Sequence, residues 1–175
     1  MTRKIANMAK NAAAILLLMT YVCILSACQR YSFAINENVV YEPPPLFQDY
    51  KIEDKTLRNC VAAAIVEQEV RKPEQLKKLT CPPGQIESLV GLETFNQLQQ
   101  LGLAQNQISN IITLKKLTEL KKLDLRENQI IDFSVLQSLQ KLEQVYTKGN
   151  IDADCSTLPS EFKNLRLDKP EHCLT

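Results

Sequence analysis

The middle of this chain repeats with a period of 22 residues. A sequence period of this length is compatible with few folds. Adding 22 to the position of one apolar residue leads to another, over three or four copies and through seven or eight columns. The best aligned columns are Leu76, Leu98, Leu120 and Leu142, then Leu79, Leu101, Leu123 and Val145, then Cys81, Leu103 and Leu125. A polar column follows, with Gly84 in the first copy and then Asn106, Asn128 and Asn150. Such a period predicts a stack of similar structural units rather than one closed core.

Each column has a physical role in the predicted unit. Alternating apolar residues such as Leu101 and Leu103 predict a short strand with one face directed inward. The asparagines Asn106, Asn128 and Asn150 are expected to turn inward and satisfy backbone groups where the chain leaves the strand. The later apolar columns are expected to pack the convex side as short 3₁₀ or irregular helical turns. Because each unit contacts only its neighbours, both ends of the stack require caps.

The pattern LxxLxLxxNxI resembles that of leucine-rich-repeat proteins, whose periods run from about 20 to 29 residues. The span from about Asp54 to Ile151 is similar to bacterial internalin-type proteins. Its opening, with LRNCV, LKKLTC and IESLVGLE, is similar to the Cys-containing cap of Gram-negative envelope leucine-rich-repeat proteins. The resemblance implies a curved α/β solenoid of about four repeats over 76–152, and a Cys60–Cys81 disulfide. The fourth copy departs from the pattern at Thr147 and Asp152, which suggests that the solenoid ends there.

Residues 51–75 are predicted to form a helical N-terminal cap. Apolar residues recur at i, i+3, i+4, i+7 and i+8, which is the stripe of an amphipathic helix: Leu57, Cys60, Val61, Ala64 and Ile65. Asp54 is a suitable N-cap residue, and Lys72-Pro73 marks a point by which the helix must have ended. One helix cannot bury this stripe alone, so it is expected to lie against the first repeat.

The segment 1–27 has the pattern of a secretory signal peptide. Arg3, Lys4 and Lys10 are followed by an uncharged run, AAAILLLMTYVCILSA, over positions 12–27. That run is short for a membrane-spanning helix, which needs about 20 residues, and a charged start with a short apolar region favours a cleaved signal. A single membrane anchor and a buried core helix are the alternatives.

The end of that segment, Leu25-Ser26-Ala27-Cys28, resembles the lipobox of bacterial lipoproteins. The resemblance implies cleavage before Cys28 and a diacylglyceryl thioether on it, so that lipid chains hold the protein at a membrane. Gln29 in place of an aspartate points to the outer membrane, with the domain facing the periplasm and the cell surface as the other possibility. Residues 28–50 are then a tether, because three consecutive prolines at 43–45 favour polyproline II. Alternatively, Leu46, Phe47 and Tyr50 pack back on the domain.

Four cysteines remain after cleavage and lipidation, and three pairings of them are possible. A solenoid keeps its two ends apart, which leaves Cys60–Cys81 and Cys155–Cys173. Each bridge would close a loop of roughly 20 residues and stabilise the fold by about 3 kcal/mol. A four-cysteine zinc site is the rival interpretation, but it lacks the usual C-x₂-C pair. Residues 153–175 are therefore predicted to be a disulfide-bonded C-terminal cap.

The charge balance excludes nucleic acid as a partner. The segment 1–27 holds three of the 21 basic side chains and none of the 20 acidic ones, which leaves 18 against 20 from position 28 onward. Such a domain lacks the positive charge that phosphate binding needs, and the chain has no tryptophan. The only histidine, His172, stands alone, and no catalytic motif, phosphate loop or metal-ligand cluster occurs. We expect a protein without enzymatic activity, cofactor or metal.

The concave face of such a solenoid carries the non-leucine positions of its strands, and a protein partner is expected to bind there. The predicted contact residues are Gln100, Lys122, Asp124, Arg126, Tyr146 and Lys148. Tyrosine and arginine are enriched in binding hot spots, and Asp124 could orient Arg126. Four strands span under roughly 20 Å, which predicts modest affinity. The alternatives are a polar face that binds nothing, a structural or spacer lipoprotein, and a periplasmic enzyme inhibitor or enzyme.

Overall fold

The structure is a computed structural model that describes residues 33–35, 38–41, 44–159 and 165–174. The chain divides into two compact units, Met1–Pro45 and Leu46–Thr175. In the first unit, β1 (Phe33–Ile35) pairs antiparallel with β2 (Asn38–Tyr41). The signal peptide and the lipidated cysteine expected at residues 1–28 lie outside the described residues. Among the helices described, none has both the length and the apolar character needed to cross a membrane.

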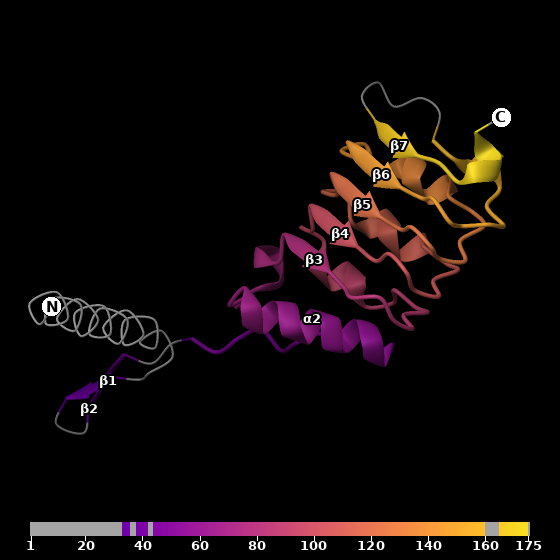
Figure 1. Ribbon diagram of the computed structural model, residues 1–175. Coiled ribbons are helices and arrows are strands. Elements are labelled where there is room, and N and C mark those ends of the chain that lie inside the picture. Colours follow the sequence, from indigo (N-terminus) through magenta and orange to yellow (C-terminus); the bar gives the residue numbers. More distant parts are fainter. Residues whose placement is uncertain (1–32, 36–37, 42–43, 160–164, 175) are drawn as a thin grey trace, which may run out of the picture. The chain divides into compact units, whose positions relative to one another are not determined.

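The second unit is built on a parallel sheet whose five strands follow one another in sequence order, as Figure 1 shows. These strands are β3 (Lys78–Thr80), β4 (Gln100–Gly102), β5 (Lys122–Asp124), β6 (Gln144–Tyr146) and β7 (Arg166–Asp168). Each strand pairs with the next at a distance of one sequence period, as for Leu79 with Leu101 and Leu123 with Val145. The period read from the sequence is therefore the register of the sheet.

The fifth strand corrects the expected count of four. Strand β7 lies in the segment that was expected to be a cap, and it continues the same register by pairing Val145 with Leu167. The polar Thr147 does not end the sheet, although it occupies a buried leucine column, because both of its polar groups are satisfied. Its backbone N–H and its hydroxyl each donate to the carbonyl oxygen of Asp168 at 2.8 Å.

Short 3₁₀ turns connect the strands on the other side of the core, as the sequence predicts. Three of them, η3 (Leu92–Phe95), η4 (Ile112–Lys116) and η5 (Ser134–Ser138), stack beside one another. The described part of the chain also contains η2 (Pro73–Gln75) before the sheet, η6 (Cys155–Thr157), and η7 (Glu171–Cys173) after it. The buried core lies between these turns and the strands, and it consists mainly of the leucine, isoleucine and phenylalanine columns of the repeat.

The helix α2 (Lys55–Glu67) covers the open end of the first repeat. Its apolar stripe is buried at Leu57, Val61, Ala64 and Ile65, as expected. The N-cap prediction is also confirmed, because one carboxylate oxygen of Asp54 accepts from the backbone N–H of Leu57 at 2.9 Å. The second oxygen accepts from the N–H groups of Glu87 and Ser88 at 2.9 and 3.2 Å. A single side chain thus fastens the cap helix to the loop of the first repeat.

The end of the predicted tether packs back on the domain. Leu46, Phe47 and Tyr50 are partly buried against the core, and the rings of Phe47 and Tyr50 contact that of Phe95 at 6.0 and 5.6 Å between centroids. The alternative weighed for these three residues is therefore the one that the structure adopts. Of the expected tether, the part from residue 46 onward belongs to the second compact unit.

The asparagine column forms a ladder of buried hydrogen bonds between repeats. Asn128 is representative: its Oδ1 accepts from the N–H of Ile108 at 3.0 Å, and its Nδ2 donates to the carbonyls of Leu103, Leu125 and Arg126 at 2.9–3.1 Å. Asn106 and Asn150 each accept in the same way from an N–H of the preceding repeat. The inward orientation inferred from the sequence is thus present in all three repeats, and each asparagine joins its own turn to the repeat before it.

Candidate functional site

The outward side chains of the parallel strands form one continuous surface, which we call the sheet face. Strand residues alternate between core and solvent, so the residues on either side of each buried Leu or Val point outward. The sheet face consists of Lys78, Thr80, Pro82, Gln100, Gly102, Ala104, Lys122, Asp124, Arg126, Gln144, Tyr146, Lys148, Arg166 and Asp168. It is the surface that the sequence identified as concave.

An ion pair fixes the middle of the sheet face. Arg126 Nε donates to Oδ1 of Asp124 at 2.9 Å, and Arg126 Nη2 donates to Oδ2 at 2.6 Å, which is the bidentate geometry of an arginine–carboxylate pair. Burial raises the pKa of the Asp124 carboxyl, but hydrogen bonds from the Arg126 side chain and backbone outweigh burial and hold that pKa below its usual range. Asp124 is therefore a carboxylate at neutral pH and orients Arg126, as the sequence suggested.

Tyr146 lies beside Asp124 in the register of the sheet, and two cations from the β5 segment contact its ring. The ring centroid is 5.7 Å from Nζ of Lys122 and 5.5 Å from Cζ of Arg126, within the range of a cation–π contact. The phenol hydroxyl donates to Oε1 of Gln144 at 3.2 Å. The aromatic ring is thus in contact with two positive charges, one from Lys122 and one from Arg126.

Four of the six predicted contact residues form one cluster of contacting side chains, and the other two lie on the same face without joining it. Lys122, Asp124, Arg126 and Tyr146 form the cluster just described. Lys148 also points outward, but its ammonium lies 3.6 Å from the carboxylate of Glu171 in η7. Gln100 on β4 is in register with Lys122, but its side chain makes no hydrogen bond to another described residue.

Sequence reasoning missed two residues of the sheet face, Arg166 and Asp168 on β7. Their position was assigned to a cap because the chain departs from the repeat at Thr147 and Asp152. A signal was present nevertheless: Arg166-Leu167-Asp168 repeats the pattern of Lys122-Leu123-Asp124 two periods further along the chain.

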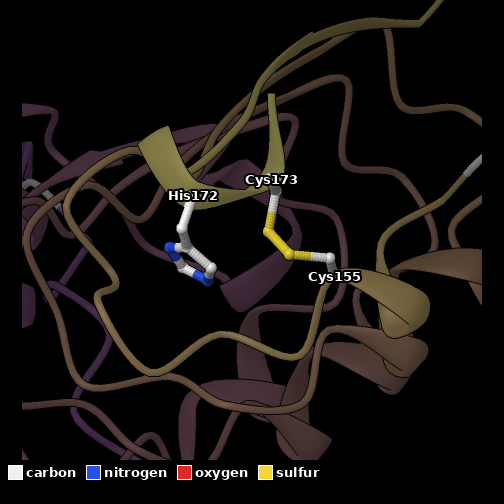
Figure 2. A group of neighbouring side chains, drawn as sticks. All are labelled: Cys155, His172 and Cys173. Carbon is white, nitrogen blue, oxygen red and sulfur yellow. A yellow bond between two sulfur atoms is a disulfide. The ribbon is translucent and has the colours of Figure 1, made fainter. Parts of the chain in front are cut away.

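The two predicted disulfides are both present. Cys60 of α2 is bonded to Cys81 at the end of β3, and Cys155 is bonded to Cys173, with Cα atoms 5.5 Å apart in each pair. Figure 2 shows His172 beside the second bridge. Its Nε2 donates to the carbonyl of Ala153 at 2.8 Å.

Cys155, His172 and Cys173 are also the one group of three possible metal ligands among the described residues. The two sulfurs are bonded to each other, and only a thiolate binds a metal well. In this disulfide-bonded state the group therefore acts as a cap rather than as a metal centre.

A pocket of about 210 Å³ lies away from the sheet face, where Ile112 and Ile131 are half exposed beside Asn110 and Asp132. The polar groups of this pocket support the backbone. Oδ1 of Asn110 accepts from the N–H of Ile112 at 2.9 Å, and Oδ1 of Asp132 accepts from the N–H of Ser134 at 2.7 Å. These bonds begin the 3₁₀ turns, so the polar side chains of the pocket have a structural role.

Comparison with known proteins supports the repeat fold. No protein-family model matches the sequence, and a comparison with curated proteins finds no match either. The structure is similar to that of an internalin (inlF) from Listeria monocytogenes, with 29% identity over 55% of this chain and 30% of the internalin, and a TM-score of 0.51. It is also similar to internalin C2 of that species, with 23% identity over 67% of this chain and 55% of the internalin, and a TM-score of 0.58.

The chain thus spans 30% and 55% of the length of the two internalins that it matches. With the five-stranded parallel sheet, these likenesses establish that the described domain has a leucine-rich-repeat fold.

Proposed function

We propose that this protein is a lipid-anchored protein of the bacterial envelope whose repeat domain binds another protein through the sheet face. The observation that carries the proposal is the contact of the Tyr146 ring with both Lys122 and Arg126 on an open sheet surface. The internalin-like repeat fold supports a role in protein binding. The charged and aromatic character of the face favours recognition over a purely structural role.

The cluster around Tyr146 is suited to a binding hot spot. Tyrosine and arginine contribute large contact areas and several hydrogen bonds, and they are the residue types that most often dominate binding energy. Asp124 and the tyrosine ring already restrain the Arg126 side chain, so less conformational entropy is lost when a partner docks. A partner that covered this cluster would also strengthen the ion pair by excluding water from it.

The dimensions of the face limit the expected affinity. Five strands at about 4.8 Å spacing extend over roughly 20 Å. A stable interface buries about 800 Å² on each partner, which is more than this face offers alone. The partner is therefore expected to bind with modest affinity or to contact the caps at either end of the stack as well.

Lipid on Cys28 would place this face in the envelope. The proposal takes the lipobox-like sequence before Cys28 as its basis, with Gln29 favouring the outer membrane and a domain in the periplasm. Two disulfides in the described domain agree with an oxidising compartment outside the cytoplasm.

The binding proposal is tested by photo-crosslinking in the native cell. A photoreactive amino acid is placed at Tyr146 in one strain and at Lys115, an exposed residue of η4, in the control strain. A specific protein adduct from position 146 and not from position 115, identified by mass spectrometry, is the expected result. Adducts from position 115 alone, or from neither position, would overturn the proposal in favour of a structural or spacer role.

The anchoring proposal has its own test. Cys28→Ala should abolish incorporation of an alkyne-labelled palmitate and leave the segment 1–27 uncleaved. Cys23→Ala, which changes a cysteine inside the expected signal peptide, should leave both unchanged. Label in the Cys28→Ala protein, or cleavage at the usual position in it, would contradict the anchor.

A further inference from the structure

One row of the sheet face alternates cations and amides across all five strands. The register aligns Lys78 with Gln100, Gln100 with Lys122, Lys122 with Gln144 and Gln144 with Arg166. We call these five residues the cation–amide stripe. It contains no acidic residue, and its three cations stand on alternate strands.

The cations of this stripe are open to a partner. Lys78, Lys122 and Arg166 are exposed, and among the residues that the structure describes none of them lies within ion-pair distance of a carboxylate. The ammonium group of Lys122 contacts the ring of Tyr146. Three aligned positive charges on one surface thus remain available for negative groups from outside.

The neighbouring row contains two aspartates and no cation. It contains Thr80, Gly102, Asp124, Tyr146 and Asp168, in register across the same strands. A uniformly charged polyanion that covered the cation–amide stripe would bring negative charge close to Asp124 and Asp168. A protein segment can instead place a carboxylate against the stripe and a neutral or hydrogen-donating group against the next row.

The spacing of the cations indicates which backbone conformation of a bound protein segment would fit the stripe. Neighbouring strands are about 4.8 Å apart, so cations on alternate strands are separated by roughly 9.6 Å at the backbone. A polyproline II segment rises about 3.1 Å per residue and has three residues per turn, which places every third side chain on one side at intervals of about 9.3 Å. In a β-strand, the third residue along points to the opposite face.

We propose that the cation–amide stripe binds an acidic segment of the protein partner, in an extended polyproline II conformation with a carboxylate at every third residue. The segment runs across the strands, from β3 toward β7. Gln100 and Gln144 donate hydrogen bonds to its backbone carbonyls between the ion pairs, and Tyr146 packs against its apolar side chains. This inference rests on the proposed function of the sheet face and adds the chemistry of its partner.

The test uses three defined probes and the full chain purified from its native cells. The first probe is a fluorescein-labelled peptide of six Glu-Pro-Pro units, and the second has the same composition with its six glutamates in one block. The third is a labelled heparin oligosaccharide of matched charge. Fluorescence anisotropy at low and at physiological salt measures the affinity of each.

The spaced peptide should bind at least about fivefold more tightly than the block peptide and than heparin, and its binding should weaken with salt because ion pairs at a surface are screened. The triple variant K78Q/K122Q/R166Q should lower the affinity for the spaced peptide at least about tenfold. The control K55Q/K115Q/K116Q removes the same charge from α2 and η4 and should leave the affinity unchanged. Thermal unfolding checks that both variants fold.

Tighter binding of heparin or of the block peptide would overturn the inference, as would an equal loss in both triple variants or no binding of the spaced peptide. The strain with the photoreactive amino acid at position 146 shows whether only the acidic-segment inference fails or the proposed function of the sheet face fails as well. If the adduct at position 146 persists in K78Q/K122Q/R166Q, the face binds a protein by other means. If the spaced peptide binds but position 146 yields no adduct, the stripe has the inferred chemistry and the proposed function fails.

Discussion

Arg126 follows Asp124 by two positions at the end of β5, and their side chains meet on the solvent side of the sheet in a pair with two hydrogen bonds of 2.9 and 2.6 Å. This pair places the guanidinium 5.5 Å from the ring of Tyr146 on the next strand. The local ion pair and the cross-strand cation–π contact therefore share one cation. A change that removes the Asp124 carboxylate therefore also frees the Arg126 guanidinium that packs on Tyr146.

Asp124→Asn should weaken partner binding while changing the stability of the fold only slightly. The pair is half exposed on its arginine side, and surface ion pairs contribute little, so the free energy of unfolding should fall by under about 1 kcal/mol. Arg126 should lose its fixed orientation, and faster exchange of its Nε proton should be visible by NMR. A partner captured at position 146 should bind at least about threefold more weakly. Unchanged binding with a mobile Arg126 would show that its orientation is irrelevant.

Asp54 should make the fold sensitive to acid. Burial raises the pKa of its carboxyl, but backbone hydrogen bonds from Leu57, Glu87 and Ser88 together outweigh burial and lower it. A carboxyl with a lowered pKa in the folded state stabilises the fold fully above its unfolded value of about 3.9, and the stabilisation is lost as the pH falls through the folded pKa.

Asp54→Asn tests that dependence. Asparagine still caps a helix, but its Nδ2 cannot accept from Glu87 and Ser88 as the Asp54 oxygen does. We expect a loss of about 1–2 kcal/mol at pH 7, measured by urea unfolding, that shrinks toward zero by about pH 2–3. Glu53→Gln, a change at the exposed neighbouring residue, should have little effect at either pH. An equal loss by Asp54→Asn at both pH values would contradict the role of its charge.

Asn128→Ala should be among the most damaging polar substitutions. It removes four hydrogen bonds and leaves the N–H of Ile108 without an acceptor, whereas the carbonyl of Leu103 keeps its bond from Nδ2 of Asn106. An unsatisfied buried group costs about 1–3 kcal/mol and each of the three other hydrogen bonds contributes about 0.5–1.5 kcal/mol, so a loss of about 3–5 kcal/mol is expected in urea unfolding. Gln129→Ala, at the exposed next residue, should change stability by under about 0.5 kcal/mol. A loss below about 1 kcal/mol for Asn128→Ala would refute the role of the ladder.

The parts of the fold that follow a sequence period could be predicted, because the period determines which residues are neighbours in space. Leu101 and Leu123 stand one period apart and pair in the sheet for that reason. The buried stripe of α2 and the asparagine ladder follow in the same way. Disulfide pairing could also be inferred, since a stack that separates its ends leaves Cys60 near Cys81 only.

The parts that depend on side-chain geometry could not be predicted. Thr147 indicated an end of the solenoid because a polar residue in a buried column ordinarily costs free energy, and only the structure shows its hydroxyl bonded to the carbonyl of Asp168. The ion pair between Lys148 and Glu171 also depends on where η7 turns. The candidate site has the same limit. The sequence placed Tyr146 and Lys122 on one face, but whether the ammonium group contacts the ring depends on the side-chain rotamers.

The bridge between Cys155 and Cys173 should stabilise the last strand in particular. It closes a sequence separation of 18 residues that contains β7, and loops of this length contribute about 3 kcal/mol when they are crosslinked. In the described sheet, strand β7 has a neighbour only in β6, where the N–H of Arg166 donates to Glu143 at 2.8 Å and that of Thr147 to Asp168 at 2.8 Å. Such an edge strand should open first when the bridge is absent.

Cys155→Ser/Cys173→Ser should therefore raise amide hydrogen exchange at Arg166 and Thr147 by at least about tenfold, while protection in α2 and β4 stays close to that of the unaltered protein. The matched variant Cys60→Ser/Cys81→Ser should show the reverse pattern, with faster exchange in α2 and none of the loss at β7. Mass spectrometry of exchanged peptides measures both. Faster exchange throughout the domain in either variant would mean that the stack opens as one unit, and that the bridge stabilises the whole solenoid rather than the end that it closes.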